Sequence, residues 1–595
     1  MSTDAIADDA VATTAPVDTR YRDSELPVDE RVEILLAQMT LEEKAGLFFH
    51  TMIGIGDLEQ ANPIFGSPSA VDFVERRLMT HFNLLGAAPT GREIAVWHNA
   101  VQRLAASTRL GIPVTLSTDP RHSFSENPGA AIMAGPFSQW PETMGLAAIG
   151  DEELVERFAD IARQEYTAVG LRVALHPQVD LATEPRWARQ TATFGEDPEL
   201  SGRMGAAYIR GFQGESFGPG SVSTMTKHFP GGGPQKDGED PHFAYGREQV
   251  YPGGRFDLHL KPFEAAFEAG TRQIMPYYGM PVGTEYEEVG FGFNKSVITG
   301  LLRERYGFDG VVCTDWGLIN DAEIFGQPFP ARAWGVEHLT PRERMKKVLD
   351  AGVDQFGGEA CPELLLELVA DGEITEERLD ASARRILREK FELGLFENPY
   401  VHEDAADEIV GRAEFRAAGE AAQRASVTLL TNDGVLPFAR GVRLYVEGID
   451  ASVAAAYGTV VDTPADADVA ILRLQAPFEQ RASMFENFFH AGSLAFPEEV
   501  VVHVGEVAAS VPTVVDVLLD RPAILEPITD AAAAVTGNWG VSAPALLDVL
   551  SGAAEPKGRL PFDLPRSMAA VEASRPDVPF DTEDPLFRFG HGLTL

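Results

Sequence analysis

Cysteine, positive charge and long apolar runs are all scarce in this chain of 595 residues. Its only cysteines are Cys313 and Cys361, and neither lies in a CxxC pattern or a Cys/His cluster. We therefore expect two reduced thiols rather than a disulfide or a zinc site. Lys and Arg number 49 against 90 Asp and Glu, and the resulting net charge of -41 repels phosphate backbones and anionic lipids. Nucleic acid and membrane partners are thereby disfavoured.

Targeting signals are lacking as well. Residues 1–19 contain no Lys or Arg and no apolar core, which argues against a secretory signal, and no later run is long enough to cross a bilayer. A cytoplasmic location is the expectation that follows. The histidines show no metal-ligand spacing, and Gly54-Ile55-Gly56 lacks the third glycine of a dinucleotide loop, so we expect neither a metal nor a cofactor.

The pattern along the chain predicts two α/β domains. Residues 1–20 are acidic and rich in Ala and Thr, which is typical of a disordered tail. Between 21 and 395, short β-branched runs alternate with amphipathic stretches, and this predicts a TIM barrel of the (β/α)8 type. Residues 396–423 are expected to form a linker, and 424–595 an α/β sandwich domain that contributes to the active site. Thr40 and Glu43 have the spacing of a capping box at an early helix.

Polar side chains gather where the predicted barrel strands end. In a parallel barrel the loops at the carboxyl ends of the strands form one face, where binding residues collect. Each of these residues alone has a structural explanation, such as a helix cap, a surface ion pair or a core histidine. Five strand ends that carry such residues together favour a functional face. The residues in question are Asp119, Asp180 with Arg186, Lys227 with His228, Tyr277 with Tyr278, and Asp315 with Trp316.

Asp315 is the strongest candidate among them on physical grounds. It follows the apolar run 311–314, so it should lie at the rim of a partly dry pocket. A carboxylate that acts as a nucleophile must stay ionised, and Arg186, Lys227 and His228 are the cations available to keep its pKa low. Trp316 offers an apolar face on which a sugar ring can stack, although a core aromatic is a fair competing interpretation.

Several motifs of the chain resemble glycoside hydrolase family 3, from about residue 32 to the end. Residues 307–316, ending Thr-Asp315-Trp316, resemble the family's nucleophile motif, and Lys227-His228-Phe resembles its substrate motif. Residues 184–189 and 194–198 resemble its Pro-Arg-Trp and Gly-Glu-Asp stretch. Residues 426–438 are similar to the opening strand of the family's second domain, and 558–561 and 589–593 to its C-terminal signature.

The resemblance implies roles for individual residues. Asp315 would be the catalytic nucleophile, and Trp316 and either Tyr277 or Tyr278 would lie beside it. The hydroxyls of the sugar in the cleavage subsite would be bound by four further residues. These are Asp119, Arg186, Lys227 and His228.

The second catalytic carboxyl is less well defined by the sequence. Family members with two domains supply a Glu from the second domain, on the loop that follows the run 469–474. Glu486 is the candidate we favour, because its phenylalanine neighbours could raise its pKa, and Glu479 is the alternative. Single-domain hexosaminidases of the family instead use a His paired with an Asp, and Asp240 and His242 have that spacing.

These observations predict an exo-acting retaining β-glycosidase that hydrolyses terminal β-D-glucosides or β-xylosides by double displacement. A small glycoside or oligosaccharide is then its substrate. The alternative is a β-N-acetylhexosaminidase or a β-glycoside phosphorylase built on Asp240 and His242. A remote alternative is an inactive sugar-binding protein. The phenylalanine-rich loop 478–496 could pack on a second copy, which would make a homodimer.

Overall fold

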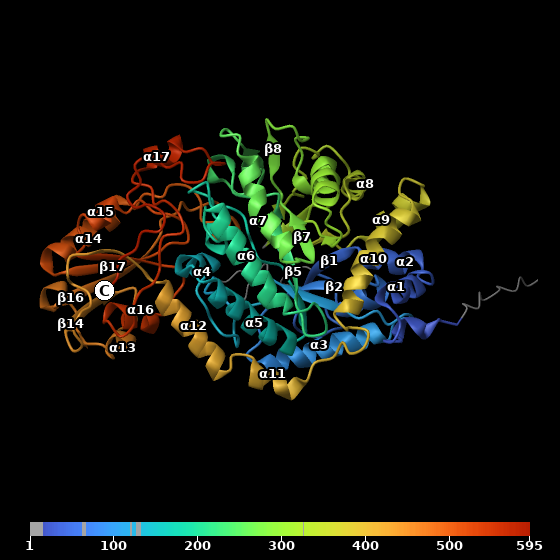
Figure 1. The fold of residues 1–595 in the computed structure, drawn as a ribbon, viewed down its shortest axis with the longest axis horizontal. Coiled ribbons are helices and arrows are strands. Elements are labelled where there is room, and N and C mark those ends of the chain that lie inside the picture. Colours follow the sequence, from blue (N-terminus) through green and yellow to red (C-terminus); the bar gives the residue numbers. More distant parts are fainter. Residues whose placement is uncertain (1–15, 62–66, 120–121, 126–131, 325) are drawn as a thin grey trace, which may run out of the picture.

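The computed structural model describes residues 16–61, 67–119, 122–125, 132–324 and 326–595, and two domains are visible in Figure 1. The first domain is built on eight parallel strands. A parallel bridge between Cys313 and Gln355 joins the last strand of the sheet to the first, so the sheet closes as the predicted TIM barrel requires. In sheet order the strands are β12 (Phe356–Gly357), β1 (Phe49–Gly54), β2 (His81–Leu85), β3 (Thr115–Thr118), β4 (Leu171–Ala174), β5 (Ser223–Phe229), β7 (Gln273–Pro276) and β9 (Val311–Val312).

Amphipathic helices cover the outside of the barrel (Figure 1). The predicted capping box is confirmed at α2, where the Glu43 N–H donates to Thr40 and the Glu43 carboxylate accepts the N–H of Thr40. Asp197 caps α6 in the same way, by accepting the N–H of Leu200. The helices of this domain are α1 (Val28–Leu36), α2 (Leu41–Leu47), α3 (Gly91–Ala106), α4 (Thr143–Ile149), α5 (Glu152–Ala168), α6 (Pro198–Gln213), α7 (Phe256–Glu268), α8 (Pro341–Ala351), α9 (Pro362–Ala370) and α10 (Glu376–Glu392). Two short ribbons, β6 (Glu248–Val250) with β8 (Met280–Val282) and β10 (Ala322–Ile324) with β11 (Gln327–Phe329), lie outside the barrel sheet.

The second domain contains a six-stranded sheet in which only β13 runs antiparallel to its neighbour. This confirms the predicted α/β architecture. The strands, in sheet order, are β13 (Thr428–Asn432), β18 (Ala534–Asn538), β17 (Thr513–Leu518), β16 (Val469–Gln475), β14 (Arg443–Glu447) and β15 (Thr459–Val460). Its helices are α13 (Ala451–Ala454), α14 (Glu498–Ser510), α15 (Glu526–Thr529), α16 (Ala543–Leu550) and α17 (Met568–Ala573).

The predicted linker is largely helical. It contains α11 (Glu403–Ile409) and most of α12 (Ala413–Ser426), and α12 leads from the barrel to the second domain (Figure 1). Asn99 of α3 donates to the carbonyl of Val401, which fixes the start of this segment to the barrel. Most of the predicted tail, residues 1–20, lies outside the described residues, and the 3-10 turn Thr19–Arg22 marks the start of regular structure.

The two domains share buried surface. Met144, Ala148 and Ala182 of the first domain belong to one apolar cluster with the core of the second. Residues 558–595 then return to the barrel, where the buried Glu196 accepts the N–H groups of Asp563 and Phe580. Such a continuous core fixes the loops of the second domain relative to the carboxyl ends of the barrel strands. No helix in the described part of the chain is both long and apolar enough for a membrane span.

Candidate active site

Asp315 lies just beyond β9, at the mouth of the barrel, and is 7% exposed. One of its carboxylate oxygens, Oδ2, is buried and accepts no hydrogen bond from the described residues. The nearest basic atom is Nε2 of His228, at 3.7 Å, and it is also buried without a partner. A buried polar atom without a partner costs free energy, so this pair of atoms marks a place where a ligand supplies the missing hydrogen bonds.

The charges around Asp315 have opposing effects. Burial raises the pKa of the Asp315 carboxyl above its usual value, because it disfavours the charged form. Cationic neighbours act in the other direction and favour the ionised carboxylate. These neighbours are His242, Arg189 and Lys227, and the Tyr278 hydroxyl adds a hydrogen bond.

Asp180 determines which face His228 presents to the pocket. The Nδ1 atom of His228 lies 2.8 Å from Asp180 Oδ2, and Asp180 also accepts the N–H groups of His228 and Gly232. Burial lowers the pKa of His228 well below its usual value, so the ring is neutral and its one proton is on Nδ1. The Nε2 atom that faces Asp315 is then an acceptor. Two acceptors that face one another call for a ligand rich in hydroxyl donors.

Lys227 and Asp119 form an ion pair, 2.5 Å apart, at the ends of β5 and β3. Both line a cavity of about 410 Å³ that also contains Asp315. Trp316 lies in the same wall, next to His50 at a ring distance of 5.4 Å. The structure thus brings Asp119, Lys227, Asp315 and Trp316 to one pocket. His228 does not line the pocket itself but faces Asp315.

Tyr278, rather than Tyr277, lines this pocket. Its hydroxyl donates to the carbonyl oxygen of Trp316 at 2.8 Å and helps to lower the pKa of the Asp315 carboxyl. Tyr277 is buried behind it, where its ring packs on His228 at 4.5 Å. Of the two tyrosines that the sequence left open, Tyr278 is in direct contact with the carboxylate, whereas Tyr277 supports a neighbour.

Arg186 and Arg189 differ in the same way. Arg186 is held by both oxygens of Glu184, at 2.8 and 3.0 Å, and does not line the Asp315 pocket. Arg189, three residues further on, does line it, and one of its guanidinium nitrogens is buried without a partner. Sequence reasoning missed Arg189, although it stands in the same Pro-Arg-Trp-Ala-Arg motif. The motif was the available signal, but it did not distinguish its two arginines.

The phenylalanine-rich loop of the second domain forms the roof of the pocket. Phe485 packs on Phe329 at 4.9 Å, and Phe489 packs on His242 at 4.6 Å. Arg481 adds an ion pair of 2.7 Å to Glu239 of the first domain. The composition of this loop is therefore explained by contacts within one chain, and a homodimer remains a prediction.

Neither predicted carboxylate of this loop lines the Asp315 pocket. Glu486 accepts the N–H and hydroxyl of Ser483 and the hydroxyl of Tyr245. These bonds help to hold its pKa below the usual value, although partial burial opposes them. Glu479 is exposed and accepts the N–H of Ser493. In this conformation both oxygens of Glu486 and Oε1 of Glu479 accept hydrogen bonds from residues other than those of the Asp315 pocket.

Asp240 and His242 form a hydrogen-bonded pair inside the pocket. His242 Nδ1 lies 2.6 Å from Asp240 Oδ1, and the His242 ring lines the same wall as Asp315. Burial would raise the pKa of Asp240, but His242 and Arg189 together keep it below the usual value. Asp240 is therefore ionised and fixes the orientation of the imidazole.

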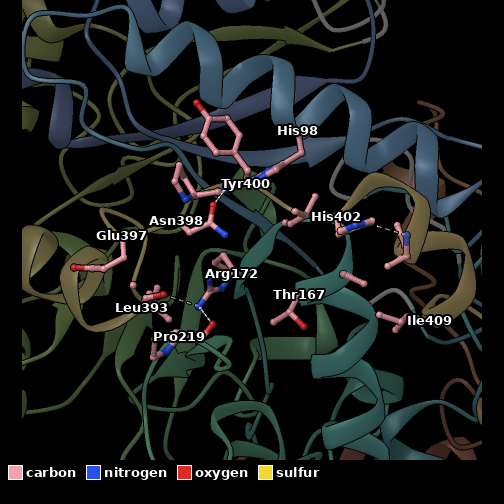
Figure 2. Close-up of a pocket in the computed structure, with 17 residues that line it drawn as sticks. His98, Thr167, Arg172, Pro219, Leu393, Glu397, Asn398, Tyr400, His402 and Ile409 are labelled. Carbon is pink, nitrogen blue, oxygen red and sulfur yellow. Dashed lines mark hydrogen bonds between the residues drawn. The ribbon is translucent and has the colours of Figure 1, made fainter. Parts of the chain in front are cut away.

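A separate cavity, of about 320 Å³, lies at the opposite end of the barrel, where the strands begin, and is shown in Figure 2. Its most prominent charge, Arg172, donates to the carbonyls of Ser221, Pro219 and Leu393. His98 lies 2.9 Å from the carbonyl of Pro399. Backbone carbonyls satisfy Arg172 and Nε2 of His98, and only Nδ1 of His98 is left buried without a partner among the described residues. This cavity brings together no carboxylate, stacking ring and lysine as the pocket around Asp315 does.

A buried carboxylate beside an aromatic ring and several charged side chains is the arrangement expected of an enzyme that acts on glycosides. Comparison with known proteins agrees. Residues 87–389 match the glycosyl hydrolase family 3 N-terminal domain, and 442–595 match its C-terminal domain. The chain belongs to glycoside hydrolase family 3 and is a glycoside hydrolase.

Relatives and solved structures cover nearly the whole chain. "Beta-glucosidase C" of Emericella nidulans is 53% identical over 579 residues, which is 96% of this chain and 93% of the relative. "Periplasmic beta-glucosidase/beta-xylosidase" of Dickeya chrysanthemi is 45% identical over 598 residues, 96% of this chain and 91% of the relative. Among structures, the β-glucosidase of Listeria innocua in complex with isofagomine has a TM-score of 0.75 at 23% identity, over 95% of this chain and 83% of the other. At that identity the structure supports the fold alone.

Proposed function

We propose that the chain is an exo-acting retaining β-glucosidase that also accepts β-xylosides, with Asp315 as its nucleophile. The observation that carries this proposal is the buried, unpartnered Oδ2 of Asp315 in a pocket lined by hydroxyl-binding groups. The names of the two relatives, one a β-glucosidase and one a β-glucosidase/β-xylosidase, support the substrate class. They do not favour an N-acetylhexosaminidase or a phosphorylase.

The first step transfers the sugar to the enzyme. Asp315 Oδ2 attacks the anomeric carbon, a C–O ester bond forms and the glycosidic C–O bond breaks. The departing oxygen carries away the electron pair of that bond and takes a proton from a general acid. Lys227, Asp119 and Arg189 bind the hydroxyls of the same ring and hold its anomeric carbon at the carboxylate.

We assign the acid/base role to His242 in preference to Glu486. His242 lies in the pocket with Asp315 and is oriented by Asp240, whereas Glu486 is engaged by Ser483 and Tyr245. In the second step the neutral imidazole removes a proton from water. The water oxygen then attacks the anomeric carbon, and the bond to Asp315 breaks.

The test uses aryl β-glucosides with azide as an external nucleophile. Asp315→Ala should lose turnover, because no ester can form. Among His242→Ala, Glu486→Ala and Glu479→Ala, the acid/base variant is the one that azide rescues with a β-glycosyl azide product. Rescue of Glu486→Ala in place of His242→Ala would refute our assignment, and full activity of Asp315→Ala would refute the nucleophile.

The cytoplasmic location stays a prediction, which cell fractionation tests. The word "periplasmic" in the name of the Dickeya relative makes that experiment worthwhile. For the oligomeric state, a gel-filtration mass that matches a single chain would exclude the homodimer.

A further inference from the structure

A second chamber lies against the pocket of Asp315, on the side of the second domain. Its volume is about 440 Å³, close to the 410 Å³ of the first chamber. Both volumes lie within the range typical of ligand sites, roughly 300–1,000 Å³. Four side chains line both chambers and therefore stand between them. They are Asp119, Arg189, Lys227 and Phe489.

The far wall of this second chamber comes from the second domain. His490 lies there, paired with Asp520 and stacked on Phe478 at 3.8 Å between ring centroids. The ring of Phe488 lines the chamber as well. Neither His490 nor Asp520 has a part in the reaction proposed above, because neither lines the pocket of Asp315.

Two buried polar atoms in these walls have no hydrogen-bond partner among the described residues. One is a donor, Nη1 of Arg189, and the other is an acceptor, Oδ1 of Asp520. A hydroxyl can both donate and accept, so a ligand with several hydroxyls satisfies both atoms at once. Aromatic rings beside them provide faces for the C–H groups of a pyranose. This combination fits a neutral sugar better than an anion, since Asp520 would repel a negative charge.

The catalytic residues lie outside the second chamber, and this places the chamber relative to the bond that is cleaved. Asp315, His242 and Trp316 line the first chamber only, so the bond that breaks and the leaving group lie there. The hydroxyl-binding Asp119, Lys227 and Arg189 form the partition. Whatever enters the second chamber must therefore be attached to a hydroxyl of the sugar that is cleaved.

We infer that the second chamber is a subsite for a second sugar ring carried as a branch on the terminal sugar. The enzyme then releases a disaccharide, made of the cleaved sugar and its branch, in one turnover, in addition to single sugars. This inference rests on the proposed function, because it uses Asp315 and His242 to locate the leaving group. The chemistry of the step is unchanged, and the branch linkage itself stays intact.

Aryl β-glycosides with an α-linked second glucose test this inference. A β-glycosidase does not cut the α-bond, so phenol released from a 4-nitrophenyl β-maltoside or β-isomaltoside requires both rings to bind at once. We expect at least one of the two substrates to yield phenol and the intact disaccharide. The kcat/KM should lie within about tenfold of the aryl β-glucoside, a difference of about 1.4 kcal/mol.

Two variants connect this activity to the second chamber. Ala192→Trp places an indole in the chamber, and it should lower kcat/KM for the α-linked substrate by about tenfold or more, with little change for the aryl β-glucoside. Asp520→Asn replaces the acceptor without a change of size and should act in the same direction. Ala405→Trp is the matched control, because it fills the cavity of Figure 2 at the other end of the barrel and should leave both substrates unaffected.

The outcomes separate the two proposals. If the aryl β-glucoside is cleaved but neither α-linked substrate yields phenol, the second chamber is not a branch subsite and the proposed function stands. If the α-linked substrate is cleaved equally well by wild type and Asp520→Asn, the second ring binds elsewhere and the inference is refuted. If even the aryl β-glucoside is not cleaved, the proposed function itself fails.

Discussion

Asp240→Asn gives the sharpest test of whether His242, oriented by Asp240, donates the proton to the leaving group. Asp240 is 2% exposed, and its Oδ1 accepts both Nδ1 of His242 at 2.6 Å and the N–H of His242 at 2.9 Å. Asparagine keeps the size of the side chain but removes the charge. A hydrogen bond to a charged group contributes about 1.5–3 kcal/mol, which corresponds to a factor of about 10 to 150 in rate.

This loss should depend on the leaving group. A phenol that departs without protonation hides the defect, whereas a poor leaving group such as an alkyl alcohol reveals all of it. The assay is kcat/KM over a series of β-glucosides whose leaving groups span a wide range of pKa. We expect a steeper dependence on the pKa of the leaving group in Asp240→Asn than in wild type.

Asp237→Asn is the matched control for that series, because Asp237 lies on the same loop and its side chain is 67% exposed. It should behave as wild type. A slope for Asp240→Asn equal to that of wild type, together with a steep slope for Glu486→Gln, would show that His242 is not the acid.

Three further outcomes are expected. Because burial raises the pKa of Asp315 and only the ionised carboxylate attacks, kcat/KM should fall with decreasing pH at a pKa above 3.8; an acid limb at or below that value would contradict this. Burial raises the pKa of Glu196 to about 8, so the folded state holds a proton that the unfolded state has lost above about 4.5. Stability should then decline from about pH 5 to 8, by at most about 1.4 kcal/mol per pH unit, and urea titrations should find this decline weaker in Glu196→Gln. Finally, Arg521 is 1% exposed and donates to carbonyls at both ends of the phenylalanine loop and to that of Arg186. Arg521→Lys should therefore raise KM about tenfold, whereas Arg473→Lys, inside the second domain, should not.

The parts of the site that lie at strand ends were predictable from the sequence. Asp119, Lys227 and Asp315 each lie at the end of a short run that the sequence marks as a strand, and parallel strands bring such positions together. Strands β1 and β2 escaped prediction because buried polar residues such as His50 and Asn83 interrupt their apolar pattern. His50 is tolerated in the core because Ser117 lies 2.7 Å from its Nε2.

Other parts of the site depend on geometry that no local pattern encodes. The turn after Glu184 decides that Arg186 turns back to this carboxylate while Arg189 reaches the pocket. Tyr245 donates a hydrogen bond to Glu486, which lies 241 positions further along the chain. No local sequence pattern indicates a contact over that separation. For the same reason the preference for His242 over Glu486 follows from the fold and not from the sequence.

Because residues 558–595 return to the barrel, the barrel cannot make all its native contacts until the end of the chain has been synthesised. Glu196 contacts the N–H of Phe580, which is made 384 residues later. At about 5–20 residues per second, that interval is roughly 20–80 s of synthesis. For much of this interval the nascent barrel lacks the residues of the second domain that cover Met144 and Ala148, and its pocket lacks the phenylalanine roof. Each new molecule is thus inactive, and most exposed to aggregation or to capture by chaperones, until translation is almost complete.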